Sequence, residues 1–466
     1  MQTQLPEPSG PFAWPLIGNL PAVRRAGLVQ FLESSWRTHG DIFHVDMGLE
    51  AVVVSHPELI KRVLAGNHAN YVKGATYDGV RRIIGNGVLA LEGPAWKSRR
   101  NLLQPAFHRS ALGKLTEAMV DTGRRHFDGL AQRTKEGWTT LDMHREMVEL
   151  TLQVVVAALF GRDLETTGSV SYEALGAAME LVSEKSNGIV LPAWLPTPAN
   201  RRFHRTMEEC ESAVFSVIAA GRARPADDGT LLSMLLHSKD ADTNLPLTDR
   251  EVRDEVFTMF VAGHETTALT LTWMFTLLEN EPAVVAAMRD EVDTVLAGRE
   301  PTFEDFPKLS YLRQVVDETL RLRGPVAMTA RTAVADDALG GFRIKAGDVV
   351  LPFFWGVHRH PEFWDAPQVF DPMRFTAERS KGRHPWSYLP FSGGQRACIG
   401  NMFSLVETVV LLAQFFARFE FEVVPNQRVV PQVMATVRPS GPVQVRVRQR
   451  AGQRASGPPV SEGISP

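Results

Sequence analysis

The chain holds one cysteine in a setting that suits a metal-bound sulfur. Cys398 lies in the stretch FSGGQRACIG, which runs from Phe391 to Gly400. Gly394 and Gly400 let the backbone approach a flat ligand where a Cβ would clash. Arg396 offers a fork of donors suited to a carboxylate. Apolar residues at helical spacing follow Cys398, so we expect its sulfur near a helix N-terminus, where backbone dipoles stabilise a thiolate.

A second group of reactive side chains lies inside a predicted helix of about thirty residues that begins at Asp249. Its middle is apolar all round, which is typical of a helix that crosses a protein interior. The sequence GHETT, residues 263–267, interrupts that apolar stretch, and buried acids and hydroxyls are costly unless they have partners or a task. We expect the Thr266 hydroxyl to donate to the carbonyl of Ala262 and to open the helix locally.

Both stretches resemble the cytochrome P-450 family. The haem-binding signature F-x-x-G-x-R-x-C-x-G is matched by Phe391, Gly394, Arg396, Cys398 and Gly400. The motif A-G-x-D/E-T-T/S is matched by Ala262, Gly263, Glu265, Thr266 and Thr267. The resemblance implies haem b with the Cys398 thiolate as axial ligand, Thr266 positioning water, and Glu265 relaying protons. Glu265 stands in place of Asp, and its longer side chain could reach a different partner.

Three more residues resemble the family's contacts with the haem propionates. Trp96 and Arg100 are four residues apart after Pro94, so on a helix they share a face and can grip one anion. Such a pair by itself is more commonly a core Trp beside a solvated Arg. The family's W-x-x-x-R pattern implies a propionate for this pair, and Arg331 resembles the arginine that binds a propionate.

An E-x-x-R pair lies in another predicted helix. Glu318 and Arg321 are three residues apart on one face and can pair. Together with Arg374 in FDPMRF they resemble the Glu–Arg–Arg network of the family. That network supports the fold behind the cysteine loop and does no chemistry.

The resemblance also indicates which segments line a distal substrate pocket. These are the loop 74–89, a lid at 189–195, and parts of the long helix, the 326–329 segment and the 434–436 turn, including Phe260, Ala262, Val326, Met328 and Met434. An apolar pocket gains most of its affinity from buried area, so we expect a lipophilic small molecule, such as a terpenoid, fatty acid or polyketide-like product. The basic pair Arg81 and Arg82 leaves a carboxylate-bearing ligand open.

The predicted elements give a mostly α fold with a small β region, the cytochrome P-450 fold, with haem between the long central helix and the cysteine loop. Strands are expected around turns at Gly48, Gly340–Gly341 and Gly347, and a C-terminal hairpin with residues 434–436 at its tip. Residues 71–93 read as a Gly-spaced loop. We expect a Pro-rich segment 1–22, one haem-thiolate monooxygenase domain over 23–450, and a disordered tail over 451–466.

Composition narrows the partners. The net charge of −3 over 466 residues does not indicate nucleic acid, and two distant cysteines suit a reducing cytoplasm. The sequence has no signal-peptide pattern and no apolar run long enough to span a bilayer, so we expect a soluble, cytoplasmic protein without a transmembrane anchor.

The predicted activity is a monooxygenase that puts one atom of O₂ into a C–H or C=C bond. The chain leaves no room for fused flavin and nicotinamide domains, so a separate ferredoxin or flavodoxin and an NAD(P)H reductase must supply electrons. A basic cluster of Lys97, Arg99, Arg109 and Lys114 could steer such a partner, although a solvated helix face explains it nearly as well. The alternatives are a haem-thiolate isomerase or peroxygenase, and a haem sensor or carrier. Intact Glu265 and Thr266 speak against both.

Overall fold

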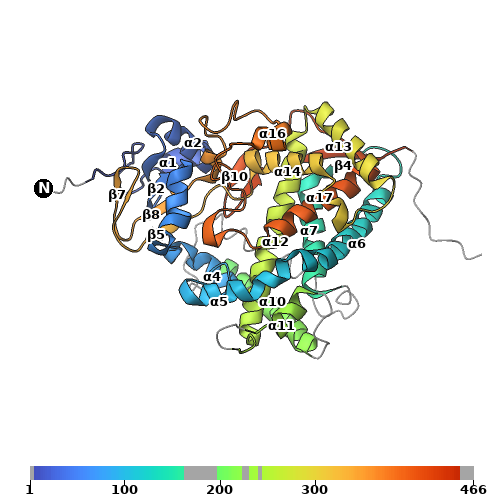
Figure 1. Cartoon of the computed structure of the whole chain (residues 1–466), viewed down its shortest axis with the longest axis horizontal. Helices are drawn as coiled ribbons and strands as arrows, with labels where there is room; N and C mark the ends of the chain where they lie inside the picture. The colour runs from blue at the N-terminus through green and yellow to red at the C-terminus, as the bar shows by residue number, and fades with distance from the viewer. Residues whose placement is uncertain (1–4, 162–196, 223–229, 240–243, 452–466) are drawn as a thin grey trace, which may run out of the picture.

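Helices form most of the molecule, and a small β region lies at the end that holds the N-terminus (Figure 1). The structure is a computed structural model that describes residues 5–161, 197–222, 230–239 and 244–451. The expected lid at 189–195 and all but the first residue of the expected tail lie outside these residues.

The helix α12, Asp249–Leu277, runs through the middle of the helical part (Figure 1). It begins at the residue predicted from sequence, because Thr248 caps it. The Thr248 hydroxyl accepts from the Glu251 N–H, and the Glu251 carboxylate accepts from the Thr248 N–H, which satisfies two free donors. The 29 residues span roughly 40 Å at 1.5 Å each. Against α12 pack α7 (Met143–Phe160), α10 (Pro198–Arg222), α14 (Ser310–Arg323) and α17 (Asn401–Arg418).

The other helices surround this centre. Apolar faces of α6, α7, α12 and α17 join in one large core, as the sequence periodicity requires. The remaining helices are α1 (Leu20–Ala26), α2 (Leu28–His39), α3 (Pro57–Lys61), α4 (Asp78–Ile84), α5 (Gly93–Leu103), α6 (Arg109–Arg133), α11 (Leu231–His237), α13 (Pro282–Leu296), α15 (Phe354–Val357) and α16 (Ala377–Ser380). None of the helices within the described ranges is long and apolar enough to span a lipid bilayer.

The main sheet has the strand order β1-β2-β8-β5-β3. Its strands are β1 (Ile42–Asp46), β2 (Glu50–Val54), β8 (Val349–Pro352), β5 (Arg331–Ala333) and β3 (Tyr71–Val72). Only β2 and β8 pair in parallel in this sheet. The predicted turns at Gly48 and Gly347 are present, as is the turn at Gly340–Gly341, which joins β6 (Asp337–Leu339) to β7 (Phe342–Ile344).

The C-terminal strands differ in part from the prediction. A hairpin of β10 (Pro431–Val433) and β11 (Val437–Pro439) has residues 434–436 at its tip, as expected. The last strand, β12 (Gln444–Gln449), instead joins β4 (Thr139–Asp142) and β9 (Phe419–Val423) in a separate sheet. Pro442 precedes it and cannot donate to a strand ladder, which separates the two units.

One further segment differs from the prediction. The loop expected over 71–93 contains the helix α4. The proline-rich start is bonded to the β region from Pro6 onward, since Pro6 and Ser9 carbonyls accept from the Arg343 and His44 N–H groups.

Candidate active site

The cysteine loop is held closed by its own backbone. The Cys398 N–H donates to the Phe391 carbonyl at 2.9 Å, and α17 begins just after Gly400. Gly394 has a φ of +71°, and a Cβ there would lie 2.1 Å from the Leu64 carbonyl oxygen. This glycine therefore accommodates the protein backbone, whereas a Cβ at Gly400 would meet no atom closer than 3.9 Å.

The thiol of Cys398 lies in a mixed electrostatic environment. Burial raises the pKa of Cys398, while the Gly400 N–H and the positive charge of Arg100 oppose that shift. The Gly400 N–H at the helix start and Arg100 stabilise the thiolate as expected, but burial favours the neutral thiol more strongly. Protein atoms surround Cys398 on all sides, yet the residue retains accessible surface. That surface therefore faces a space inside the molecule.

The middle of α12 contains the predicted Thr266 hydrogen bond, although the helix itself runs without a break over Asp249–Leu277. The Thr266 hydroxyl donates to the Ala262 carbonyl at 2.8 Å, and the Thr267 hydroxyl lies 3.2 Å from the Gly263 carbonyl. Ala262 is exposed although α12 is mostly buried, and Thr266 lies four residues on, along the same face. These two side chains form a small, partly polar surface in the interior of the molecule.

Phe260 does not belong to that surface. Its side chain is only 2% exposed and packs against the ring of His264, with centroids 5.3 Å apart. Residues two apart on a helix point about 200° away from each other, so Phe260 and Ala262 cannot line one pocket. The prediction that both line it is wrong for Phe260.

Glu265 binds the C-terminal hairpin. Its Oε1 accepts from the Thr436 hydroxyl at 2.5 Å and from the Arg438 Nε at 2.6 Å. The sequence left the partner of this longer acid open, and the structure supplies it from a segment more than 170 residues away. No sequence pattern around Glu265 could have predicted Arg438 as its partner, because the two residues are far apart in the chain.

Trp96 and Arg100 share α5 but contact different groups. The Arg100 guanidinium donates to the Ala397 carbonyl at 2.8 Å, directly beside Cys398. The Trp96 ring lies 3.9 Å beneath the guanidinium of Arg396. Arg396 also donates to the Leu91 carbonyl at 2.7 Å and to Glu92 at 2.8 Å. Both side chains of the pair therefore contact the cysteine loop, at the neighbouring residues Arg396 and Ala397.

Positive charge gathers beside the loop. Lys73, which the sequence analysis did not select, is buried, and burial together with Arg396 and Arg331 lowers its pKa to about 7. Glu92 opposes that shift. Arg331 is also buried and donates to the Thr329 hydroxyl and the Ala330 carbonyl. Lys73, Arg331 and Arg396 are close enough for their positive charges to repel one another, and their N–H donors suit carboxylates.

This set of donors fits a haem. A haem offers an iron for the thiol of Cys398 and two carboxylates for the cluster of Lys73, Arg331 and Arg396. The uncovered face of α12 at Ala262 has a small side chain where a larger one would obstruct a flat ligand. A bound metal cation also favours the thiolate that burial disfavours.

The predicted Glu–Arg–Arg network is assembled. Arg321 makes two bonds to Glu318, at 2.6 and 2.7 Å, and both side chains are fully buried. The Arg374 Nε lies 3.4 Å from Glu318. Arg321 also donates to the carbonyls of His358, Pro367 and Val369, which ties α14 to the segment that leads into the cysteine loop.

Another buried acid, Glu407 on α17, lies close to Thr267 of α12. Glu407 is completely buried, and neither carboxyl oxygen accepts a hydrogen bond from any residue that the structure describes. Burial raises its pKa to about 8, although the nearby Thr267 hydroxyl lowers it somewhat. That hydroxyl bonds to Gly263 and Ser404 instead. The sequence analysis did not select Glu407, although its place in the apolar run SLVETVVLLAQFF, residues 404–416, was a signal of burial.

The predicted basic cluster is only partly on the surface. Lys97 and Arg109 are exposed. Arg99 is buried and pairs with Glu255 at 2.7 Å and Glu251 at 2.6 Å, so it cannot receive a redox partner. Arg99 lies two residues after Lys97 on the same helix, so the two side chains point to opposite faces, and Arg99 points toward the core.

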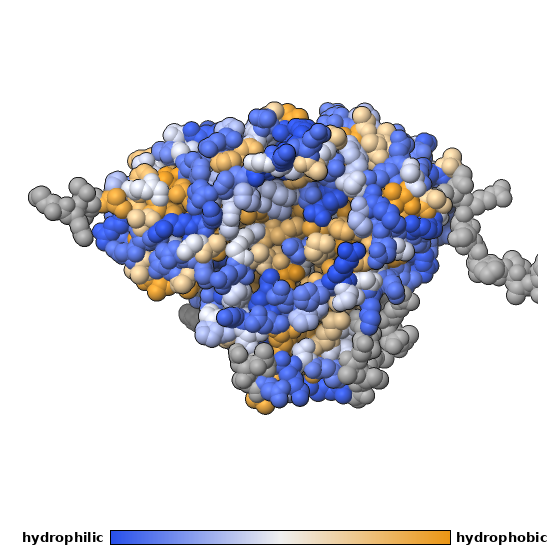
Figure 2. All heavy atoms as spheres, viewed as in Figure 1, coloured by the Kyte–Doolittle hydropathy of each residue, from blue (hydrophilic) through white to orange (hydrophobic). Residues whose placement is uncertain are grey.

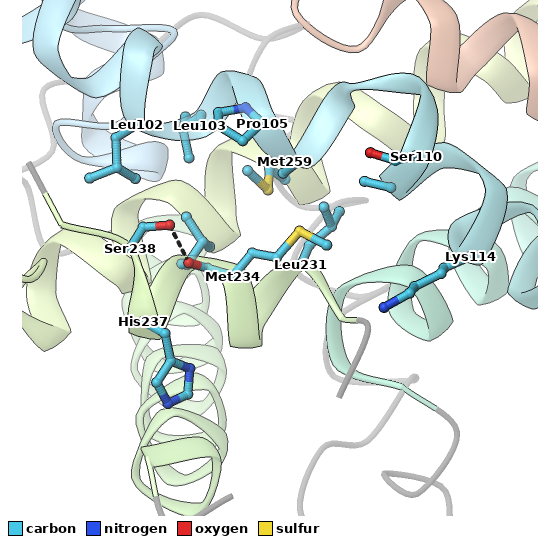
Figure 3. Close-up of a pocket in the computed structure, with 13 residues that line it drawn as sticks. Leu102, Leu103, Pro105, Ser110, Lys114, Leu231, Met234, His237, Ser238 and Met259 are labelled. Carbon is cyan, nitrogen blue, oxygen red and sulfur yellow. Dashed lines mark hydrogen bonds between the residues drawn. The ribbon is translucent and has the colours of Figure 1, made fainter. Parts of the chain in front are cut away.

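A cavity of about 410 Å³ between α5, α11 and α12 lies apart from this site (Figure 3). Its walls include Leu102, Met234 and Met259, and Lys114 of the predicted basic cluster also lines it, but none of the residues predicted to bind haem or substrate does.

An accessible cysteine at the start of a helix, a threonine bonded back into a central helix, and basic side chains beside the cysteine loop are the features of a haem-thiolate protein. The sequence model of the cytochrome P450 family matches residues 8–447, and the chain belongs to this family. It is therefore a haem-thiolate monooxygenase, which receives its electrons from reductase partners.

Named relatives and a solved structure agree with this assignment. The chain is 35% identical to cyclooctat-9-en-7-ol 5-monooxygenase of Streptomyces melanosporofaciens, over 90% of each protein. It is 32% identical to pentalenene oxygenase of Streptomyces avermitilis, over 92% of this chain and 94% of the relative. The crystal structure of the cytochrome P450DA heme domain superposes with a TM-score of 0.84 at 26% identity, covering 96% of this chain and 97% of that one.

Proposed function

We propose that the chain oxidises a terpenoid, inserting one atom of O₂ into a C–H or C=C bond, with haem b held by Cys398. The observation that carries this proposal is the interior surface where Cys398, Ala262 and Thr266 remain uncovered beside buried cations. The names of the relatives, which act on cyclooctat-9-en-7-ol and pentalenene, support a terpenoid over a fatty acid or a polyketide-like product.

Each residue near the cofactor has a distinct task. The Cys398 sulfur would bind the haem iron, and Lys73, Arg331, Arg396, Arg100 and Trp96 would hold and orient the haem carboxylates. When bound, haem supplies the two-electron activation of O₂. Phe391, Gly394 and Gly400 shape the loop that carries the sulfur.

The α12 residues handle water and protons. The Thr266 Oγ, anchored to the Ala262 carbonyl, holds a water on the uncovered face of the helix. Glu265 is engaged by Arg438 and Thr436, so it must leave the hairpin before it can pass a proton toward Thr266. The same hairpin carries Met434, which lines the pocket with Ala262, Val326 and Met328.

Electrons come from a separate ferredoxin or flavodoxin with its NAD(P)H reductase. Lys97 and Arg109 remain available to an acidic partner, and Arg99 supports α5 from inside. Such exposed charges change the association rate more than the affinity.

The absorption spectrum of the reduced carbonyl complex tests the axial ligand. We expect wild-type protein to give the thiolate-type band and Cys398→Ala to lose it. Cys210→Ala is the matched control, because Cys210 is the other cysteine and is buried in α10. A thiolate-type band that survives Cys398→Ala contradicts the assignment.

Turnover separates the monooxygenase from its rivals. Product formation with reductase, NAD(P)H and O₂ is expected to exceed product formation with peroxide alone. A peroxygenase would show the reverse order, an isomerase would convert substrate without O₂, and a sensor or carrier would form no product.

A further inference from the structure

Large hydrophobic side chains gather on the surface near the start of the chain. Fourteen such side chains are exposed among the described residues, and six of them fall between residues 5 and 20: Leu5, Phe12, Trp14, Leu16, Ile17 and Leu20. Figure 2 shows hydrophobic surface at the end of the molecule beside the grey N-terminal residues. Single exposed hydrophobic residues are ordinary, but a cluster marks an interaction site.

The loop at the centre of this cluster is rigidly built. The backbones of Trp14 and Gly18 exchange two hydrogen bonds, at 2.9 and 2.8 Å. Leu16 lies at the apex with a φ of +70°, and its side chain is completely exposed. A leucine at positive φ is uncommon and strained, so the closed loop imposes this conformation.

The same loop is fixed to the sheet. The Asn19 side chain donates to the Phe12 carbonyl at 2.9 Å and accepts from the Asp46 N–H at 2.8 Å. This bond places the β1–β2 turn beside the loop, and that turn adds Leu49, which is half exposed. The apolar side chains are therefore presented on a firm, convex support.

Positive charge flanks the apolar loop. Arg24 and Arg25 end α1, and both are exposed without an ion pair among the described residues. Leu20 and Arg24 are four residues apart and share one face of the helix. Aromatic and aliphatic side chains next to unpaired arginines are typical of an element that lies in a membrane interface.

We propose that this element, residues 12–25, docks the protein on the surface of an anionic phospholipid bilayer. Leu16 and Phe12 enter the boundary between headgroups and acyl chains, and Arg24 and Arg25 bind lipid phosphates. We assign a bilayer as the partner because an exposed apolar loop can insert into a soft, deformable lipid surface. The flanking positive charge also complements anionic headgroups.

Co-sedimentation of the haem-loaded full chain with vesicles tests the proposal. Wild-type protein is expected to pellet with vesicles of equal phosphatidylcholine and phosphatidylglycerol. Leu16→Asn keeps a residue that tolerates positive φ and is expected to weaken binding about tenfold. Leu245→Ser removes a leucine that is 64% exposed elsewhere and is expected to have no effect.

A second experiment tests the role of positive charge with the double variant Arg24→Gln and Arg25→Gln. This double variant is expected to lose binding severalfold on the mixed vesicles and to match wild type on phosphatidylcholine alone. Wild-type protein that never pellets overturns the proposal, and so does equal binding of Leu16→Asn and wild type. A concentration-dependent dimer that Leu16→Asn abolishes, without vesicle binding, would assign the surface to a second copy of the chain.

Discussion

At the residue scale, the proposed delivery of protons depends on Thr266 and Glu265 of α12 and on the groups that hold them. Thr266 bonds inside its own helix, whereas Glu265 bonds outside it. The two neighbours therefore differ in how easily each can move during turnover.

Thr266→Ala is expected to bind substrate and accept electrons but to release them as peroxide. The reason is that the hydroxyl that holds water on the open face of α12 is gone. Product per NAD(P)H should fall roughly tenfold or more, in line with the usual contribution of a positioned proton donor. Thr266→Ser retains the hydroxyl and should stay near wild type. Equal product yield in Thr266→Ala and wild type contradicts this role.

Arg438→Gln is expected to loosen the hairpin that carries Met434. A charge-assisted bond contributes about 1.5–3 kcal/mol, so substrate affinity should fall about tenfold while the maximal rate changes less. The measurement is a substrate titration followed by the spin state of the haem iron. Arg438→Lys should restore part of the affinity. An unchanged titration curve in Arg438→Gln would show that Glu265 does not control the hairpin.

Glu407 gives the protein a pH-dependent stability. Its pKa of about 8 in the folded protein, against an ordinary value of 4.5, means that the folded state holds the proton more tightly. The contribution of Glu407 to stability is therefore fully present below about pH 4.5 and falls as the pH rises toward about 8. Glu407→Gln should raise the thermal midpoint by several degrees at about pH 8 and by less at about pH 5. A difference between wild type and variant that is independent of pH would contradict the assignment.

At the element scale, the loop between α4 and α5 is attached to α12 by two acids. The Asn86 and Val88 N–H groups donate to Asp254 and Glu255, at 2.8 and 3.1 Å. Gly87 allows this approach, since a Cβ there would lie 1.9 Å from the Thr258 hydroxyl. The buried acids of α12 thus position a loop that ends at Glu92 and that binds Lys73, because Lys73 donates to the Leu89 carbonyl and to the Glu92 carboxylate.

Gly87→Ala is expected to push this loop away from α12 and to lower the unfolding free energy by about 1–3 kcal/mol, as overpacking does. Haem retention should weaken with it, because Lys73 and Glu92 move. Gly79→Ala is the control, since a Cβ at Gly79 meets no atom within 4 Å and a helix favours alanine. Chemical denaturation of both variants checks the difference, and equal midpoints would contradict it.

At the scale of the whole molecule, the Glu318–Arg321 pair joins the helical part to the cysteine loop. Because both groups are fully buried, removing one leaves an uncompensated charge. Glu318→Gln should cost about 3–5 kcal/mol and reduce haem content together with folded yield.

A surface pair at the same spacing is the comparison for this prediction. Lys61 and Glu58 are also three apart, but both are about half exposed. Lys61→Ala should therefore cost about 1 kcal/mol or less. Equal losses in the two variants, measured by thermal unfolding and haem content, would show that burial of the Glu318–Arg321 pair does not matter.

The sequence by itself determined whatever depends on short spacing. The start of α12 at Asp249, the Thr266 bond to Ala262, the Glu318–Arg321 pair and the turns at Gly48 and Gly347 each involve residues within a few positions, where backbone geometry sets the distance. The family, and with it the monooxygenase class, followed from motifs of the same local kind.

Only the tertiary structure decided the partners across the chain. Glu265 binds Arg438, Arg99 turns inward to Glu255, and Lys73 joins Arg331 and Arg396. It also showed that Phe260 faces the core and that Glu407 is buried without a hydrogen bond from any described residue. These outcomes depend on which helix face meets which neighbour, and that is set by packing of the whole core, which no local spacing of residues encodes.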